Sequence, residues 1–440
     1  MDRRAQRAWC FYDWANSAFA TTVMAALFPP FFRELAIAAG RGETQATALW
    51  GYVTAGALLL IAITAPVLGA VADAAGGRKR FLAFFAGLGI LATGLFATLG
   101  SEGWRTAAVL YIAANFGFAG SIIFYESLLP ALARGRDMDR LSTQAYGLGY
   151  AGGGLLLVVN LLWVMHPEWF NMPDRGFAVR ASFVSVAIWW GIFSLPLLKY
   201  VPEPPVTPLA AGKAGVKAEG PIITQGFRRL ATTLREISRY RQLLIFLAAY
   251  WIYNDGIGTI VKMATAYGSE IGIGMTDLIG ALVLTQAVGI PFAILFGRLA
   301  RRTGPKPAIL LALAVYLIIS IFGFFLSTAP QFYVLAGLVG TVQGGAQALS
   351  RSLFAAMVPR HRASEFFGFY SSSGKLAGVA GPLVFGLVSQ GTGTSRLGIL
   401  SLVVFFAFGG WLLTRVDVAA GEAAARRAEQ EAGYRETEIP

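Results

Sequence analysis

The chain has 440 residues, of which 56% are hydrophobic and only 14% are charged, whereas a soluble domain has roughly 45–50% apolar and about 25% charged residues. Its net charge is +12, but the basic residues lie in short segments between apolar runs, which argues against nucleic-acid binding. A single cysteine, Cys10, excludes an internal disulfide and a cysteine metal cluster.

Apolar runs recur along the whole chain, and each is long enough to cross about 30 Å of hydrocarbon as a helix. Long runs such as Ile309 to Leu326 lack the alternation of a membrane β-strand. We therefore predict an all-α polytopic membrane protein, with the first run retained as a helix. The predicted spans are 9–32, 47–72, 81–100, 106–132, 141–165, 178–199, 241–264, 277–300, 307–327, 331–357, 364–390 and 395–415.

The longest connection divides these twelve spans into two sets of six. We predict an N-terminal six-helix half at 1–200, a cytoplasmic linker at 201–240, a C-terminal six-helix half at 241–416 and a cytoplasmic tail at 417–440. The linker contains one apolar helical face with arginines around it, typical of a basic amphipathic helix on the inner leaflet or of a solvated linker helix. That face is formed by Phe227, Leu230, Leu234 and Ile237.

The distribution of Lys and Arg predicts the orientation. If the N-terminus is cytoplasmic, 28 of the 36 basic residues fall on the cytoplasmic side, six fall in outer loops, and Lys262 and Lys375 lie within spans. Basic residues accumulate on the cytoplasmic side of membrane proteins. We therefore expect both termini in the cytoplasm, and the Ala- and Gly-rich composition favours a bacterial inner membrane.

The connections after the second and eighth predicted spans repeat one pattern. Gly69 and Gly76 lie seven residues apart, and Gly297 and Gly304 have the same spacing at the matching place in the second half. Either loop alone also fits an ordinary basic turn, but two at matching places do so less well. Parallel repeats of six spans indicate a transporter built from two halves.

The first connection, Gly69-Ala-Val-Ala-Asp73-Ala-Ala-Gly76-Gly-Arg78-Lys79-Arg80, resembles the loop motif of the major facilitator superfamily. The resemblance implies the major facilitator fold, with twelve transmembrane helices in two six-helix halves. It also implies a gating loop in which Gly69 and Gly76 shape a tight turn, Asp73 contacts a neighbouring helix, and Arg78 and Lys79 hold a cytoplasmic gate. The sequence departs from the motif at Ala74 and Gly77, and in the second half Arg301 replaces the acid.

Six further motifs, in order along nearly the whole chain, resemble the vacuole-effluxer-like branch of this superfamily, which is named for a fungal vacuolar amino-acid effluxer. One departure is Glu126, where Asn is common in the branch. The resemblance implies transport of small solutes, with amino-acid export as the example. The motifs begin at Trp9 (Trp-Cys-Phe-Tyr-Asp-Trp-Ala-Asn-Ser-Ala), Phe124 (Phe-Tyr-Glu-Ser-Leu-Leu-Pro), Gly147 (Gly-Leu-Gly-Tyr-Ala-Gly-Gly), Tyr253 (Tyr-Asn-Asp-Gly), Gln343 (Gln-Gly-Gly-Ala-Gln-Ala-Leu-Ser-Arg-Ser) and Glu365 (Glu-Phe-Phe-Gly-Phe-Tyr).

In major facilitators the first, fourth, seventh and tenth spans usually line the central cavity. The resemblance therefore brings together polar groups of these four spans as candidates for the substrate or proton pathway. They are Tyr12, Asp13, Asn16 and Ser17 of span one; Asn115, Tyr125 and Glu126 of span four; Tyr253, Asn254 and Asp255 of span seven; and Gln343, Gln347 and Arg351 of span ten.

Asp255 is the strongest single candidate. It lies in the middle of an apolar run, and a carboxylate at membrane depth costs about 2.5–3.5 kcal/mol on insertion scales. A carboxyl group that gains and loses a proton as access alternates is a workable coupling site. The competing interpretation is a fixed ion pair, with Lys375 in span eleven as the partner.

The other charged candidates lie nearer the cytoplasmic ends of their spans, and each has a structural alternative. Asp13 also fits a helix cap or a side chain that reaches the interface. Glu126 also fits a pair with Arg134, Arg136 or Arg140. Arg351 fits a bidentate contact with a substrate carboxylate, a cytoplasmic gate or a lipid phosphate. Interhelical hydrogen bonding explains Asn115, Gln343 and Gln347 equally well.

Glycines leave one face of span five almost bare, at 147, 149 and 152–154. Close helix packing is the favoured interpretation, and a sliding surface between the halves is the alternative. Gly378, Gly381 and Pro382 in span eleven pose the same choice.

The sequence lacks a Walker A motif, a metal-ligand set and the motifs of hydrolases, so we expect no cofactor, no metal and no enzyme activity. The leading hypothesis is a secondary active transporter of small solutes that works by alternating access, with protons as possible coupling ions, membrane lipids as partners and the monomer as working unit. The alternative is a non-transporting sensor, scaffold or lipid-handling protein on a transporter fold.

Overall fold

The computed structural model describes residues 2–41, 43–100, 103–204, 235–392 and 394–432, and every regular element in these ranges is a helix. Ten of the described helices are long and apolar enough to cross a membrane, which confirms the all-α, multi-pass architecture. The main helices are α1 Arg3–Ala18, η1 Phe19–Leu27, α2 Phe28–Ala38, α3 Glu43–Ala75, α4 Arg78–Leu95, α5 Trp104–Ser127, α6 Leu129–Leu132, α7 Arg136–Met165, α8 Arg175–Tyr200, α11 Arg241–Glu270, α12 Met275–Thr303, α13 Pro305–Phe324, α14 Ala329–Ala356, α15 Ala363–Ala377, α16 Ala380–Thr392, α17 Ser395–Ser401, α18 Val403–Thr414 and α19 Val418–Glu431.

Polar side chains start several of these helices. Asp174 accepts the N–H of Phe177 at 2.7 Å at the start of α8, and Thr328 and Gln331 form a capping box at the start of α14. Such caps satisfy backbone N–H groups that have no partner within the helix. The helix interiors that follow have apolar side chains, and their backbone N–H and C=O groups bond to one another within the helix, as a membrane requires.

Several predicted spans are divided between consecutive helices, and the first and the eleventh have prolines near the division. In the first, α1 passes through the π-helix η1 into α2, whose first turn contains Pro29 and Pro30. In the eleventh, α15 ends at Ala377 and α16 begins at Ala380, next to Pro382. Proline has no N–H to donate and its ring crowds the preceding turn, so a regular α-helix is interrupted at both places.

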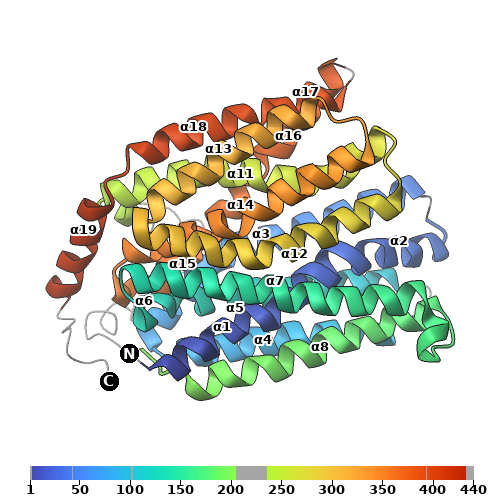
Figure 1. Cartoon of the computed structure of the whole chain (residues 1–440). Coiled ribbons are helices and arrows are strands. Elements are labelled where there is room, and N and C mark those ends of the chain that lie inside the picture. The colour runs from blue at the N-terminus through green and yellow to red at the C-terminus, as the bar shows by residue number, and fades with distance from the viewer. Residues whose placement is uncertain (1, 42, 101–102, 205–234, 393, 433–440) are drawn as a thin grey trace.

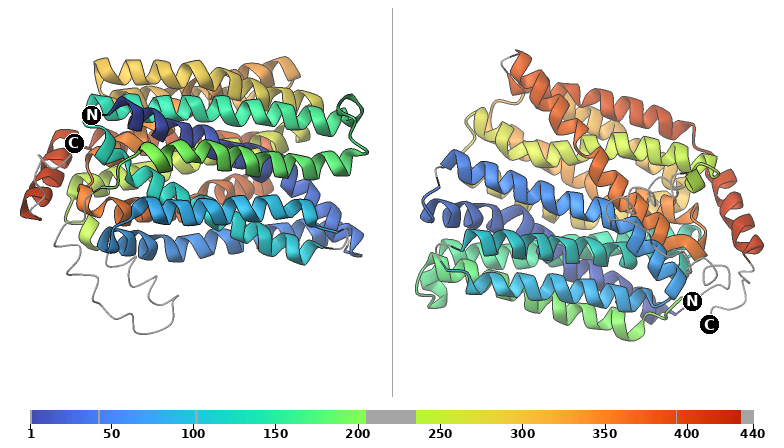
Figure 2. Two further views of the ribbon diagram at one scale, coloured as in Figure 1. Left: turned by 90° about the horizontal axis from the view of Figure 1, so that it is seen from below. Right: turned by 180° about the vertical axis from the view of Figure 1, so that it is seen from behind.

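The helices lie side by side in one elongated bundle, with α1–α8 on one side and α11–α18 on the other (Figures 1 and 2). Within the first group α4 packs against α5, and α1 packs against α7 and α8. Within the second, α12 packs against α14 and α11 against α18. The two groups meet where α3 packs against α15 and where α7 packs against α12 and α14. Most of the predicted linker, 205–234, including Phe227, Leu230 and Leu234, lies outside the described residues.

One end of the bundle gathers the basic junctions between helices. It holds the start of α1, the α3–α4 turn at Arg78–Arg80, the start of α7 and the α12–α13 junction at Arg301–Lys306, and α19 lies across it (Figure 1). We call it the basic end. Lys306 donates to the carbonyls of Thr414 and Val416, each at 2.8 Å, which ties α13 to the end of α18.

The glycines of α7 contact two neighbouring helices, α1 and α12. A Cβ at Gly152 would lie 2.6 Å from the carbonyl oxygen of Trp14, and one at Gly153 would lie 3.0 Å from Ser17, so these glycines allow α1 to approach closely. Gly147 and Gly154 face Ile294 and Gln286 of α12 at ordinary contact distances. Close packing therefore explains the glycines that face α1, whereas the others lie at the contact between the two groups of helices.

We expect Gly152→Ala to lower the melting temperature, because the new methyl group meets the backbone of α1 and overpacking typically costs about 1–3 kcal/mol. Gly87→Ala on α4 is the matched control, since a Cβ there has nothing within 4 Å. Thermal unfolding of the purified proteins, followed by tryptophan fluorescence, measures both. Equal melting temperatures for the two variants would show that α1 moves aside without cost.

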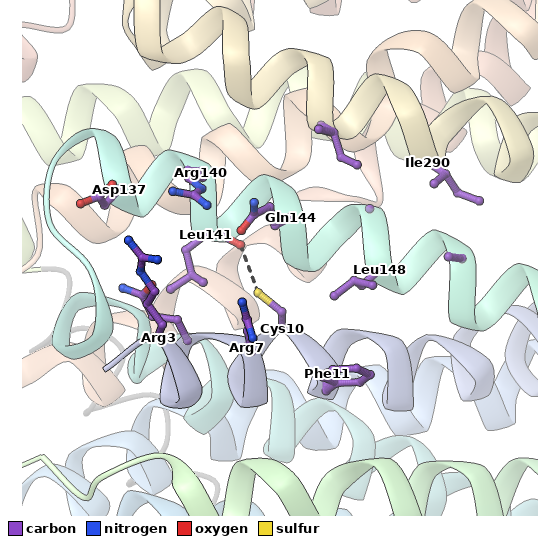
Figure 3. A pocket seen from close by; sticks show the side chains of 14 residues that line it. Arg3, Arg7, Cys10, Phe11, Asp137, Arg140, Leu141, Gln144, Leu148 and Ile290 are labelled. Carbon is purple, nitrogen blue, oxygen red and sulfur yellow. Dashed lines mark hydrogen bonds between the residues drawn. The ribbon is translucent and has the colours of Figure 1, made fainter. Parts of the chain in front are cut away.

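A groove of about 530 Å³ opens on the side of the bundle between α1, α7 and α12 (Figure 3). It begins at the basic end, near Arg3 and Arg7, and continues past Leu148 to Ile290.

Candidate functional site

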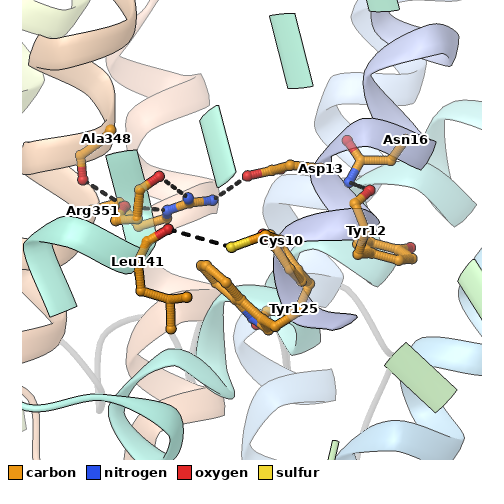
Figure 4. Close-up of polar contacts among 10 residues, drawn as sticks. Cys10, Tyr12, Asp13, Asn16, Tyr125, Leu141, Ala348 and Arg351 are labelled. Carbon is orange, nitrogen blue, oxygen red and sulfur yellow. Dashed lines mark hydrogen bonds and ion pairs between the residues drawn. The ribbon is translucent and has the colours of Figure 1, made fainter. Parts of the chain in front are cut away.

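Arg351 of α14 lies buried between the two groups of helices, with 2% of its surface exposed. Its Nη1 forms an ion pair with Asp13 Oδ2 of α1 at 3.2 Å (Figure 4). Its Nε donates to Ser142 Oγ of α7 at 2.9 Å, and its Nη2 donates to the Ser142 carbonyl at 3.0 Å. We call Arg351, Asp13 and Ser142 the arginine latch, since one side chain of the second half binds two helices of the first.

Aromatic rings surround the arginine latch. The centroids of Tyr146, Trp9 and Tyr125 lie 4.5, 4.9 and 5.6 Å from the Arg351 guanidinium carbon. Trp9 stacks on Tyr125 and donates its Nε1–H to the Tyr125 carbonyl at 2.9 Å. Cation–π attraction helps to compensate the removal of the guanidinium from water. One carboxylate, two hydrogen bonds and three rings thus stabilise this buried charge.

Further hydrogen bonds join the two halves beside the arginine latch. Ser142 Oγ donates to the Ala348 carbonyl at 2.7 Å, and Ser352 Oγ donates to Asp139 Oδ1 at 2.6 Å. Both pairs link α7 to α14 within a few turns of their basic ends. These contacts join the two halves near the basic end, along the α7–α14 contact.

The predicted gating loop also contacts the second half. Gly76 and Gly77 have φ of 71° and 82°, in the left-handed region that favours glycine, and form the turn between α3 and α4. Arg78 is buried and donates to the carbonyls of Ser127 and Arg360 at 3.2 and 2.9 Å. The backbone N–H of Lys79 donates to Glu203 at 3.1 Å. The side chain of Asp73 lies outside the described residues.

The two repeated glycines mark matching close approaches. A Cβ at Gly69 of α3 would lie 2.7 Å from the Ser364 carbonyl carbon and 2.9 Å from Glu365 Cα, both in the backbone of α15. A Cβ at Gly297 of α12 would lie 3.0 Å from Thr143 Cβ of α7. The internal repeat therefore supplies a glycine to two of the helix pairs that join the halves, α3–α15 and α7–α12.

Polar contacts with α19 and with Glu236 stabilise the junction between α14 and α15. The N–H of Arg360 donates to Glu429 of α19 at 2.9 Å. Arg362 bonds Glu365 at 2.8 Å and also forms an ion pair with Glu236. Burial alone would lower the pKa of Arg362, but the carboxylates of Glu365 and Glu236 outweigh it and raise the pKa above its ordinary value. Arg362 therefore stays charged at any physiological pH.

Asp255 of α11 lies at the break in span eleven, 3% exposed. Its Oδ2 accepts the N–H of Gly381, in the first turn of α16, at 2.6 Å. A Cβ at Gly381 would lie 2.8 Å from the other carboxylate oxygen, so only glycine allows this approach. Asp255 thus binds the start of the half-helix α16. The side chain of Lys375, its expected partner, lies outside the described residues.

The remaining candidates are distributed along the same helices. Tyr253 bonds Ser350 of α14 at 2.6 Å, which links α11 to the turn before Arg351. Asn16 donates to the Tyr12 carbonyl at 2.7 Å, and the Tyr12 ring packs on Tyr125. Asn115 and Glu126 are buried on α5, whereas Asn254, Gln343 and Gln347 are half-buried.

The structure brings together Asp13 and Arg351, which sequence reasoning treated as separate candidates. It also adds Ser142, Tyr146 and Trp9, of which only Trp9 belongs to one of the six motifs. Ser142 lies two residues after Arg140 near the start of α7, and its only sequence signal is a hydroxyl at the second position of a predicted span. Asp255, by contrast, is separate from the arginine latch and belongs to the contact between α11 and α16.

Comparison with known proteins gives a consistent result. Residues 1–426 match the family described as "Vacuole effluxer Atg22 like". The MFS-type transporter YxiO of Bacillus subtilis is 37% identical over 407 residues, covering 92% of this chain and 93% of the relative. Among solved structures, the human organic anion transporter MFSD10 superposes with a TM-score of 0.68 at 15% identity, covering 93% and 99% of the two chains. The proton:xylose symporter XylE superposes with a TM-score of 0.71 at 13% identity, covering 98% of each chain.

Proposed function

Since this chain belongs to the vacuole effluxer Atg22-like family of multi-pass membrane proteins, we propose that it is a secondary active transporter that moves small solutes by alternating access. The proposal places the protein in a bacterial inner membrane with the basic end in the cytoplasm. The concentration of Lys and Arg at that end supports this orientation.

The arginine latch is the observation that supports alternating access. Arg351, Ser352 and Arg78 bond across the halves, and all three contacts lie toward the basic end. A transporter that opens to one side at a time needs contacts that hold the other side closed and can later be released. In this proposal the structure is the state closed to the cytoplasm, and opening to the cytoplasm breaks the arginine latch.

Amino acids are the proposed solutes, with protons as the coupling ion and export as the direction. An amino acid has a carboxylate and an ammonium group, which Arg351 and the carboxylates of Asp13 and Asp255 complement in charge. A proton on Asp13 would weaken its ion pair with Arg351 and free the guanidinium. A proton on Asp255 would weaken its bond to Gly381 and change how α16 is held.

We expect Asp255→Asn to reduce solute-driven proton movement at least tenfold while the protein stays folded. Asparagine keeps an oxygen that accepts the Gly381 N–H, but it cannot gain or lose a proton. The measurement uses proteoliposomes with an imposed pH gradient and a lumenal pH dye, to which a panel of amino acids and other small solutes is added.

The matched control is Asp174→Asn, because Asp174 is an exposed helix cap and asparagine caps equally well. Proton movement that persists in Asp255→Asn would make Asp255 structural and leave Asp13 and Glu126 as the coupling candidates. If no solute moves protons in the wild type, but labelled solute still exchanges, the proposed coupling is wrong and transport remains.

A further inference from the structure

The lateral groove between α1, α7 and α12 lies outside the arginine latch and has a chemistry of its own (Figure 3). Arg3, Arg7 and Phe11 follow one another at intervals of four residues on α1, so they share one helical face. Arg140, Gln144 and Leu148 do the same on α7. All six line the groove.

The lining changes from charged to apolar along the groove. Both α1 and α7 begin at the basic end, so their arginines lie together there, and Phe11 and Leu148 lie deeper in the bundle. Ile290 and Ile294 of α12 complete the apolar part. Gly147 and Ala151, which have little or no side chain, leave room between these walls. The groove is thus polar where a membrane has headgroups and apolar where it has acyl chains.

The charge at the basic end of the groove is not neutralised within the described part of the chain. The guanidinium groups of Arg3, Arg7 and Arg140 are exposed and form no ion pair with the residues described. One carboxylate, Asp137, lines the groove beside them. Three guanidinium groups against one carboxylate attract an anion, and the planar guanidinium is well suited to phosphate.

We propose that this groove binds one anionic phospholipid of the surrounding bilayer, with the headgroup phosphate at Arg3, Arg7 and Arg140 and an acyl chain along Phe11, Leu148 and Ile290. A free phosphate would use only the basic part and leave the apolar part unexplained. A neutral lipid would leave the arginines without a counter-ion. The bound lipid would span α1 and α7 of one half and α12 of the other, so it would hold the halves together on this side.

The test measures lipid retention by the full-length protein, independently of any transported solute. The protein is purified from micelles that contain equal amounts of dioleoyl-phosphatidylglycerol and dioleoyl-phosphatidylcholine, which differ only in the headgroup. Native mass spectrometry then counts each lipid on the protein. We expect retention of phosphatidylglycerol by the wild type. The Arg3→Gln/Arg7→Gln/Arg140→Gln variant should bind it about a hundredfold more weakly, at about fivefold for each arginine near a membrane surface.

The matched control is Arg298→Gln/Arg301→Gln/Arg302→Gln, which removes the same charge from exposed arginines of α12 at the basic end that do not line the groove. An equal loss of phosphatidylglycerol retention in both triple variants would overturn the site, because lipid retention would then depend only on the net charge of the protein. If the groove triple variant does not fold, the single variants Arg7→Gln and Arg301→Gln provide the same comparison. Arg7→Gln should then bind phosphatidylglycerol about fivefold more weakly than Arg301→Gln.

Two further measurements separate a lipid from a soluble anion. Ala151→Phe fills the apolar part of the groove and leaves the arginines in place, so we expect it to lower phosphatidylglycerol retention. Glycerol phosphate in millimolar excess should not displace the lipid. Unchanged retention in Ala151→Phe, or displacement by glycerol phosphate, would overturn the proposal in favour of a site for a small free anion.

Discussion

Replacing Asp13 with asparagine is expected to stop transport and to open the basic end of the protein. The change leaves the Arg351 guanidinium buried without its carboxylate, although both bonds to Ser142 remain. Removing one partner of a buried ion pair costs about 3–5 kcal/mol. That cost destabilises the state that is closed at the basic end, in which Arg351 is buried. The population of the closed state relative to the state open at the basic end should therefore drop about a hundredfold or more.

The distance across the basic end reports this shift directly. Spin labels on Arg80→Cys of α4 and Arg302→Cys of α12, both exposed, are read by double electron–electron resonance in a Cys10→Ser background. We expect a longer distance in Asp13→Asn than in the parent. Asp417→Asn is the control, since it removes a charge from an exposed helix cap at the same end.

A double-mutant cycle separates the ion pair from general damage to the fold. Asp13→Asn/Arg351→Met removes both charges and leaves no unpaired guanidinium, so its melting temperature should recover most of what Asp13→Asn loses. The arginine latch would not be what holds the basic end closed if the losses in melting temperature caused by the two changes simply added. The same conclusion would follow if Asp13→Asn kept the short distance between the spin labels.

The fold could be predicted from the sequence because each span satisfies its own backbone. A continuous apolar run of sufficient length satisfies its backbone hydrogen bonds in a membrane as an α-helix. The all-α, multi-pass architecture is confirmed, and so is the family expected from the motifs. The interruptions at Pro29–Pro30 and near Pro382 were harder to predict, since a proline in a membrane helix can be accommodated as a kink or as a break.

The partners of the polar residues could not be predicted, because they depend on how distant helices pack. Asp13 and Arg351 are 338 residues apart, and no local pattern relates them. Asp255 accepts the backbone N–H of Gly381 at a helix break, a partner that no pattern indicated, whereas the alternative pair with Lys375 involves a side chain outside the described residues. A free N–H exists there only because span eleven is interrupted, which the sequence did not establish.

The repeated glycines offer the sharpest test of how the halves close. We expect Gly69→Ala to hold the basic end open and abolish transport, because the new methyl group would meet the backbone of Ser364 and Glu365 at 2.7 and 2.9 Å. A backbone atom cannot rotate away as a side chain can, so α3 and α15 must move apart. Gly297→Ala should have a milder effect, since the atoms it meets belong to the side chain of Thr143.

Gly56→Ala provides the control on the same helix. A Cβ at Gly56 has nothing within 4 Å, and alanine is better than glycine in a helix by about 1 kcal/mol, so this variant should transport normally and melt no lower than the wild type. Gly69→Ala gains the same helix propensity but loses the contact between α3 and α15. A Gly69→Ala protein that gives the parental Arg80–Arg302 label distance would show that the halves do not need this approach. The longer distance together with normal transport would show that closure at the basic end is not part of the cycle.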